Sequence, residues 1–174
     1  MAWRIDYSCN TCLHNWVERL SLTCEPKWKI GWIGSSLWLG WVFTLLFIPR
    51  LADKYGRHWI YTIGMLLLLP VFITTMCSHS IDLTIVCILL QGMLSTVRVS
   101  IGFVYMMEFV TKQRQTAMCT VFSMQPPIIT LLATLYFSTI SKHWFWFVFI
   151  GLLSLVMCCI FSFYIPESPK YLFK

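Results

Sequence analysis

Apolar residues gather along the chain in long runs that short polar links separate. A helix that crosses a bilayer needs about 20 mostly apolar residues. Five segments meet this requirement, at about residues 30–48, 59–77, 83–107, 116–140 and 144–166. The two-residue alternation of a transmembrane β-strand is absent from them. The pattern therefore predicts an all-α integral membrane protein with five transmembrane helices in a lipid bilayer.

The composition agrees with this pattern. Of the 174 residues, 58% are hydrophobic and 11% are charged, whereas soluble domains carry about 25% charged residues. A soluble enzyme and a disordered chain are therefore excluded. A nucleic-acid partner is excluded as well, because the net charge of +6 forms no basic stripe with interleaved aromatic residues. No phosphate-binding loop or nucleophile elbow occurs, so the sequence predicts no enzyme activity, no catalytic residue and no cofactor.

The Lys and Arg residues predict how the spans are oriented. The N-terminal segment, which is left aside in this comparison, carries Arg4, Arg19, Lys27 and Lys29. Beyond it, Lys and Arg occur in the links at 49–58 and 108–115 and in the C-terminal tail, whereas the link at 78–82 has none and the link at 141–143 has Lys142 alone. Cytoplasmic links carry the excess of Lys and Arg in membrane proteins. We therefore expect the C-terminus on the cytoplasmic side (the matrix side in an organelle) and, with five spans, the N-terminus outside.

Residues 1–29 hold no apolar run and are predicted to form a non-spanning outer segment, with residues 30–174 forming the helical bundle. Apolar residues in this segment follow helical spacing, namely Leu13, Trp16, Val17 and Leu20. The spacing favours a short helix on the bilayer surface, or a loop packed on the bundle.

Three cysteines lie in the same outer segment: Cys9, Cys12 and Cys24. They are candidates for a disulfide on the outer face or for free thiols. A metal site is disfavoured, because the C-x-x-C pair lacks the second pair of ligands that a structural zinc site needs.

The link between the first two predicted spans has a distinctive charge pattern. It reads R-L-A-D-K-Y-G-R-H, with Asp53 and Arg57 at i, i+4 spacing and Gly56 able to form a tight turn. These residues resemble the signature loop G-x-x-x-D-x-x-G-R-[KR] of the major facilitator superfamily. Pro49 stands in place of the first glycine, and His58 replaces the final basic residue.

A second motif stands where that family has one. Residues 166–172 read P-E-S-P-K-Y-L and resemble the P-E-S-P-R-[WY]-L motif at the end of helix six in sugar porters and organic cation/anion transporters. Glu108 and Arg114, after the third span, resemble the Glu and Arg that follow helix four. The resemblance extends over residues 13–174.

The resemblance implies a fold and a set of site residues. The five spans correspond to family helices two to six of the N-terminal bundle, so the first helix and the whole C-terminal half are lacking. It also implies a cytoplasmic gating charge network that clamps the inner helix ends, formed by Asp53, Gly56, Arg57, Glu108, Arg114 and Glu167.

Arg98 is the one charge deep in a predicted span, so it should face the bundle interior or water. At α-helical spacing it shares one face with other polar or small residues, namely Gln91, Ser95, Gly102 and Tyr105. This stripe is typical of a solute path. It is also compatible with a structural role, in which the arginine pairs within the bundle and small residues allow close packing.

Two functions follow from the resemblance. In the first, the chain is part of a facilitator-type carrier for a small organic solute, completed by a second polypeptide or by the other half of the carrier. In the second, it is a facilitator-derived structural subunit of a larger membrane complex and transports nothing.

Overall fold

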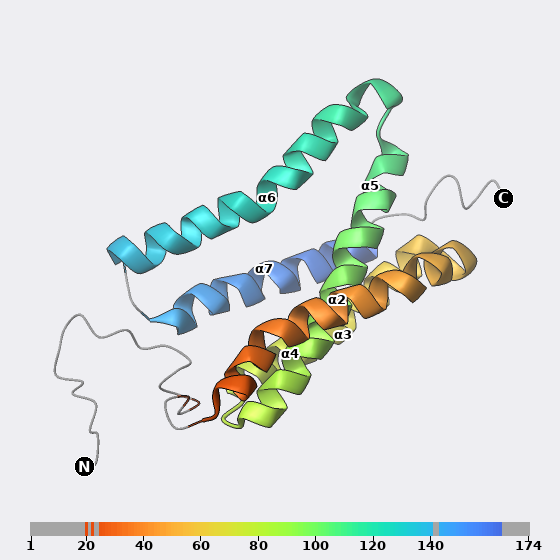
Figure 1. Cartoon of the computed structure of the whole chain (residues 1–174). Coiled ribbons are helices and arrows are strands. Elements are labelled where there is room, and N and C mark those ends of the chain that lie inside the picture. Colours follow the sequence, from red (N-terminus) through yellow and green to blue (C-terminus); the bar gives the residue numbers. More distant parts are fainter. Residues whose placement is uncertain (1–19, 21, 23–24, 141–142, 165–174) are drawn as a thin grey trace, which may run out of the picture.

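The computed structural model describes residues 20, 22, 25–140 and 143–164, and these form a helical bundle (Figure 1). The main helices are α2 (Lys27–Tyr55), α3 (Arg57–Cys77), α4 (Ile81–Thr96), α5 (Gly102–Phe109), α6 (Gln115–Leu135) and α7 (Trp144–Tyr164). A π-helical turn, Val97–Ile101, joins α4 to α5. A second one, Tyr136–Ile140, follows α6, and a 3₁₀ turn, Lys112–Arg114, precedes it.

In the described part of the chain, five helical segments are long and apolar enough to cross a membrane. They are Lys27–Tyr55, Arg57–Cys77, Ile81–Phe109, Lys112–Thr139 and Trp144–Tyr164. The prediction of an all-helical, multi-pass membrane protein with five spans is confirmed.

The first span is longer than the sequence predicts. It continues through Pro49 as far as Tyr55, so most of the expected link is helical. Only Gly56 separates α2 from α3, with φ at 98° and its N–H donating to the Ala52 carbonyl at 3.1 Å. A residue with a side chain rarely adopts this φ. The turn between the two spans therefore depends on a single glycine.

Helices α2 and α4 pack backbone against backbone. A Cβ atom added to Gly40 would lie 2.4 Å from the Leu89 carbonyl oxygen, and one added to Gly92 would lie 2.3 Å from the Leu37 carbonyl oxygen. Next to this contact, the indole Nε1 of Trp41 donates to the Ser95 hydroxyl at 3.0 Å. Glycines that allow such an approach are a common means of helix association in membranes.

Two apolar clusters hold α3 in the bundle. One joins α3 to α7 and consists of Met65, Leu68, Leu155 and Cys159. The other joins the end of α2 to the π-helical turn and consists of Ala52, Val97 and Ile101, with Tyr61 of α3 packed against it. The end of α2, the π-helical turn and α7 thus form one packed unit around α3.

Helix α6 lies apart from this unit and is connected to it through α5 (Figure 1). No residue of α6 is buried. It contacts α5 through Phe103 against Phe122, with ring centroids 5.1 Å apart, and through the sulfur atoms of Cys119 and Met107, 3.9 Å apart. Both contacts lie in the N-terminal part of α6, so the rest of the helix is open along its length.

Candidate functional site

Three charged side chains meet at one end of the bundle. Arg57 donates through Nη1 to Glu108 Oε1 and through Nη2 to Asp53 Oδ1, the second at 2.9 Å. Asp53 lies near the end of α2, Arg57 is the first residue of α3, and Glu108 lies near the end of α5. The ion pairs therefore tie the ends of three helices together.

Gly56 and helical spacing produce this arrangement. The break at Gly56 starts α3 at Arg57, which stays within one turn of Asp53, while α5 brings in Glu108 from far along the chain. The Arg57 and Glu108 side chains are 20% and 13% exposed, whereas Asp53 is 63% exposed. The Arg57–Glu108 pair is thus shielded from solvent, whereas the Arg57–Asp53 pair has the character of a surface ion pair.

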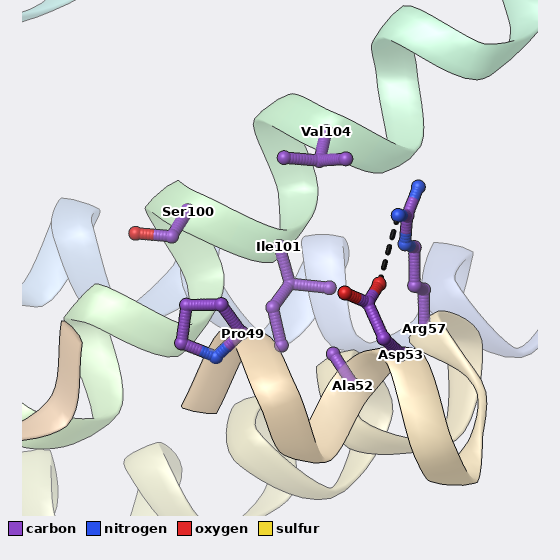
Figure 2. A pocket seen from close by; sticks show the side chains of 7 residues that line it. All are labelled: Pro49, Ala52, Asp53, Arg57, Ser100, Ile101 and Val104. Carbon is purple, nitrogen blue, oxygen red and sulfur yellow. Dashed lines mark hydrogen bonds and ion pairs between the residues drawn. The ribbon is translucent and has the colours of Figure 1, made fainter. Parts of the chain in front are cut away.

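A small pocket adjoins the cluster, as Figure 2 shows. Its volume is about 110 Å³, and it is lined by Pro49, Ala52, Asp53, Arg57, Ser100, Ile101 and Val104. The pocket lies between the end of α2 and the segment from the π-helical turn into α5. It is a gap beside the ion pairs, between elements that the ion pairs connect.

The other predicted members of the charge network lie elsewhere. Arg114 is exposed in the 3₁₀ turn and forms no ion pair with the described residues. Together with Phe109 and Met118, it lines a separate pocket of about 550 Å³. Glu167 lies outside the described residues, as do Cys9, Cys12, Cys24 and the predicted surface helix. Among the described residues, no three His, Cys, Asp or Glu side chains gather at a metal site.

The predicted polar stripe on the third span does not stay on one face. Ser95 faces α2, where it accepts the Trp41 hydrogen bond, while Gly102 faces α3, with a Cβ position 3.1 Å from the Tyr61 ring. The π-helical turn lies between them. A π-helical turn contains one residue more than an α-helical turn, which turns the later positions by about 100° around the axis. The expectation of a continuous stripe assumed α-helical spacing throughout.

The stripe residues differ in accessibility. Tyr105 is buried and packs edge-on against Phe109, and Gln91 and Ser95 are partly buried. Arg98 is exposed and lies within the π-helical turn. Of the acidic residues that the structure describes, none forms an ion pair with Arg98. Arg98 is thus the most accessible polar residue of the stripe.

The sequence alone did not indicate several residues that build the site. Trp41 and Tyr61 read as ordinary apolar positions of a span, yet one bonds Ser95 and the other packs at the π-helical turn. The signal that could have found the α2–α4 contact is a glycine near the middle of each span, Gly40 and Gly92.

Comparison with known proteins extends these observations. The sequence model of the Major Facilitator Superfamily matches residues 26–172. Solute carrier family 22 member 1 of Bos taurus is 24% identical over 157 residues, and Solute carrier family 22 member 2 of Homo sapiens is 24% identical over 156 residues. Each alignment covers 90% of this chain and 28% of the relative. The member 2 protein of Rattus norvegicus is 24% identical over 172 residues, which cover 92% of this chain and 30% of the relative. The chain thus spans less than a third of the length of these relatives.

Proposed function

Because the chain belongs to the major facilitator superfamily, a family of membrane transporters and not of enzymes, we propose that it forms part of a carrier that moves a small organic solute across a membrane. Carriers of this family hold the solute at mid-membrane between two six-helix halves. The bundle described above supplies one side of such a site. The remaining helices come from a further segment of the same polypeptide or from a second one.

The observation that carries this proposal is the ion-pair cluster of Asp53, Arg57 and Glu108. A carrier needs contacts that are strong in one state and absent in another, because only such contacts change a conformational equilibrium. The cluster connects α2, α3 and α5 across separate segments of the chain, and it is partly exposed. Its ion pairs can therefore break and form again as the helix ends move, at a lower cost than fully buried pairs would require.

The proposal includes an orientation. The cluster lies at the end of the bundle where the links rich in Lys and Arg occur, and we place this end in the cytoplasm (or the matrix) by the positive-inside rule. At the opposite end, Lys29 of α2 lies 3.6 Å from Asp82 of α4. In this assignment the cluster is an inner gate, and the Lys29–Asp82 pair connects the outer ends of two helices.

Transport assays on Glu108→Gln test the proposal. The complete carrier, which is this chain together with the segment or second polypeptide that supplies the remaining helices, is produced in cells. Uptake of radiolabelled benzenesulfonate and phenyltrimethylammonium is measured together with the abundance of the carrier at the membrane. We expect uptake of at least one probe above that of cells without the protein. Glu108→Gln should reduce it at least about fivefold at equal abundance, because Arg57 loses its shielded partner.

Lys54→Gln is the matched control. Lys54 is exposed one residue from Asp53, and its described contact is with the Tyr55 ring, so uptake should stay at the wild-type rate. Uptake that is equal in the Glu108→Gln and wild-type proteins would contradict a gating role. The absence of uptake for both probes would instead favour the structural-subunit alternative.

A further inference from the structure

Arg98 has an unusual position among the charged residues of the described spans. The others lie within two helical turns of a span end, whereas Arg98 lies in the middle of Ile81–Phe109. The midpoint of that span is residue 95, so Arg98 is about 5 Å from it at 1.5 Å per residue. The hydrocarbon core extends about 15 Å from its centre. This leaves about 10 Å to the nearer edge, more than an extended arginine side chain covers.

No counter-charge for Arg98 is present in the described part of the chain. The described acidic residues are Glu25, Asp53, Asp82 and Glu108, and each lies at a helix end. An unpaired arginine at the bilayer centre carries a substantial free-energy cost. That cost is not offset by an ion pair within the described bundle.

The π-helical turn keeps the guanidinium accessible. Residues just before the turn pack against α2, as Ser95 does, and residues within it, such as Val97, contact α3. Arg98 takes part in neither of these two contacts and is exposed. Turns of this type are rare and frequently lie at functional sites. The local backbone thus places an unpaired arginine on an open side of the bundle at mid-membrane depth.

We propose that Arg98 binds the anionic group of the transported solute, so that the substrate class is a small organic anion with a carboxylate, sulfonate or sulfate. This inference rests on the proposed function. The planar guanidinium matches such groups with two parallel N–H···O bonds. A solute anion supplies the missing counter-charge, and the low dielectric at mid-membrane strengthens the pairing.

The test compares two probes that share an aromatic ring and differ in the sign of a permanent charge. Uptake of benzenesulfonate and of phenyltrimethylammonium is measured for the wild type, for Arg98→Gln, and for Arg50→Gln. Arg50 is the matched control, since it is exposed at the end of α2 and forms no ion pair with the described residues. We expect preference for the anion, a loss of at least about tenfold in Arg98→Gln, and no loss in Arg50→Gln.

The outcomes separate this inference from the proposed function. Uptake of the cation alone, unchanged in Arg98→Gln, would leave a transporter and overturn the anion assignment. If neither probe is transported, equilibrium dialysis of the purified protein with benzenesulfonate decides: binding that Arg98→Gln abolishes supports the assignment, and no binding overturns it.

Arg98→Lys covers the case in which Arg98→Gln does not accumulate. Lysine keeps the charge and loses the paired planar donors. We then expect normal abundance and a half-saturating concentration of benzenesulfonate about three- to tenfold higher. An unchanged value would show that the guanidinium does not contact the anion.

Discussion

The contact between α2 and α4 predicts opposite effects of the same substitution at two positions of one helix. Gly34 and Gly40 both lie in α2, but a Cβ atom at Gly34 meets nothing within 4 Å, whereas one at Gly40 lies 2.4 Å from the Leu89 carbonyl oxygen. Alanine is favoured over glycine in a helix by up to about 1 kcal/mol. Gly34→Ala should therefore be neutral or slightly stabilising.

The cost of Gly40→Ala follows from the geometry. Ordinary van der Waals contact begins at 3.4 Å, so the Cβ at 2.4 Å requires about 1 Å of separation between two backbones that cannot rotate aside. Overpacking of this kind costs about 1–3 kcal/mol. Separation also stretches the Trp41–Ser95 hydrogen bond, now 3.0 Å long, which contributes about 1 kcal/mol. We expect a net loss of about 1–3 kcal/mol after the gain in helix propensity.

The assay is equilibrium unfolding of the purified protein in mixed detergent micelles. Tryptophan fluorescence and the circular dichroism of the helices report the transition. The double variant Gly40→Ala with Gly92→Ala extends the test. Both substitutions separate the same pair of helices, so their combined cost should be smaller than the sum of the single costs. Equal stability of the Gly34→Ala and Gly40→Ala proteins would refute the close backbone contact, and full additivity would refute the shared displacement.

Three further predictions concern single contacts. Gly56→Ala should lower the free energy of unfolding by about 1–2 kcal/mol, because φ of 98° strains any residue with a Cβ; Gly31→Ala, with open space around it, serves as the control. Trp41→Phe and Ser95→Ala should each cost about 1 kcal/mol and should add only in part when combined, since both remove the Trp41–Ser95 hydrogen bond while Ser95→Ala also removes the bond to the Gly92 carbonyl. Glu108→Gln should cost about 1–3 kcal/mol in the same unfolding assay, with high salt failing to reproduce the loss, because the pair is shielded from solvent.

Much of the site could be predicted from the sequence where the signal was local. Asp53, Gly56 and Arg57 lie in one short motif, and the structure places all three at the same helix break. Glu108 was predicted from its resemblance to the Glu that follows helix four in the family, and its ion pair with Arg57 is observed. Arg114 was assigned from the same resemblance; in the structure it is exposed in the 3₁₀ turn Lys112–Arg114 and forms no ion pair with the described residues.

The faces on which the residues of the predicted solute-path stripe lie could not be predicted from the sequence. A helical wheel assumes 100° for each residue, and the stripe from Gln91 to Tyr105 was continuous only under that assumption. A single π-helical turn rotates the second half of the stripe toward α3. Such turns arise from packing with neighbouring helices and leave no strong mark on composition. The pattern therefore located Arg98 in depth but could not say which side of the bundle it faces.

By itself, the sequence determined the features that depend on transfer from water to lipid and on short motifs: five membrane-spanning helices, the charged motif at 50–58, and one arginine at mid-span. These are additive or local properties, so they can be read without knowing the neighbours. The tertiary structure decided which helices meet. The backbone contact at Gly40 and Gly92, the meeting of Arg57 with Glu108 and the open length of α6 all depend on how separate helices pack, and packing is a property of pairs of surfaces that no single segment contains.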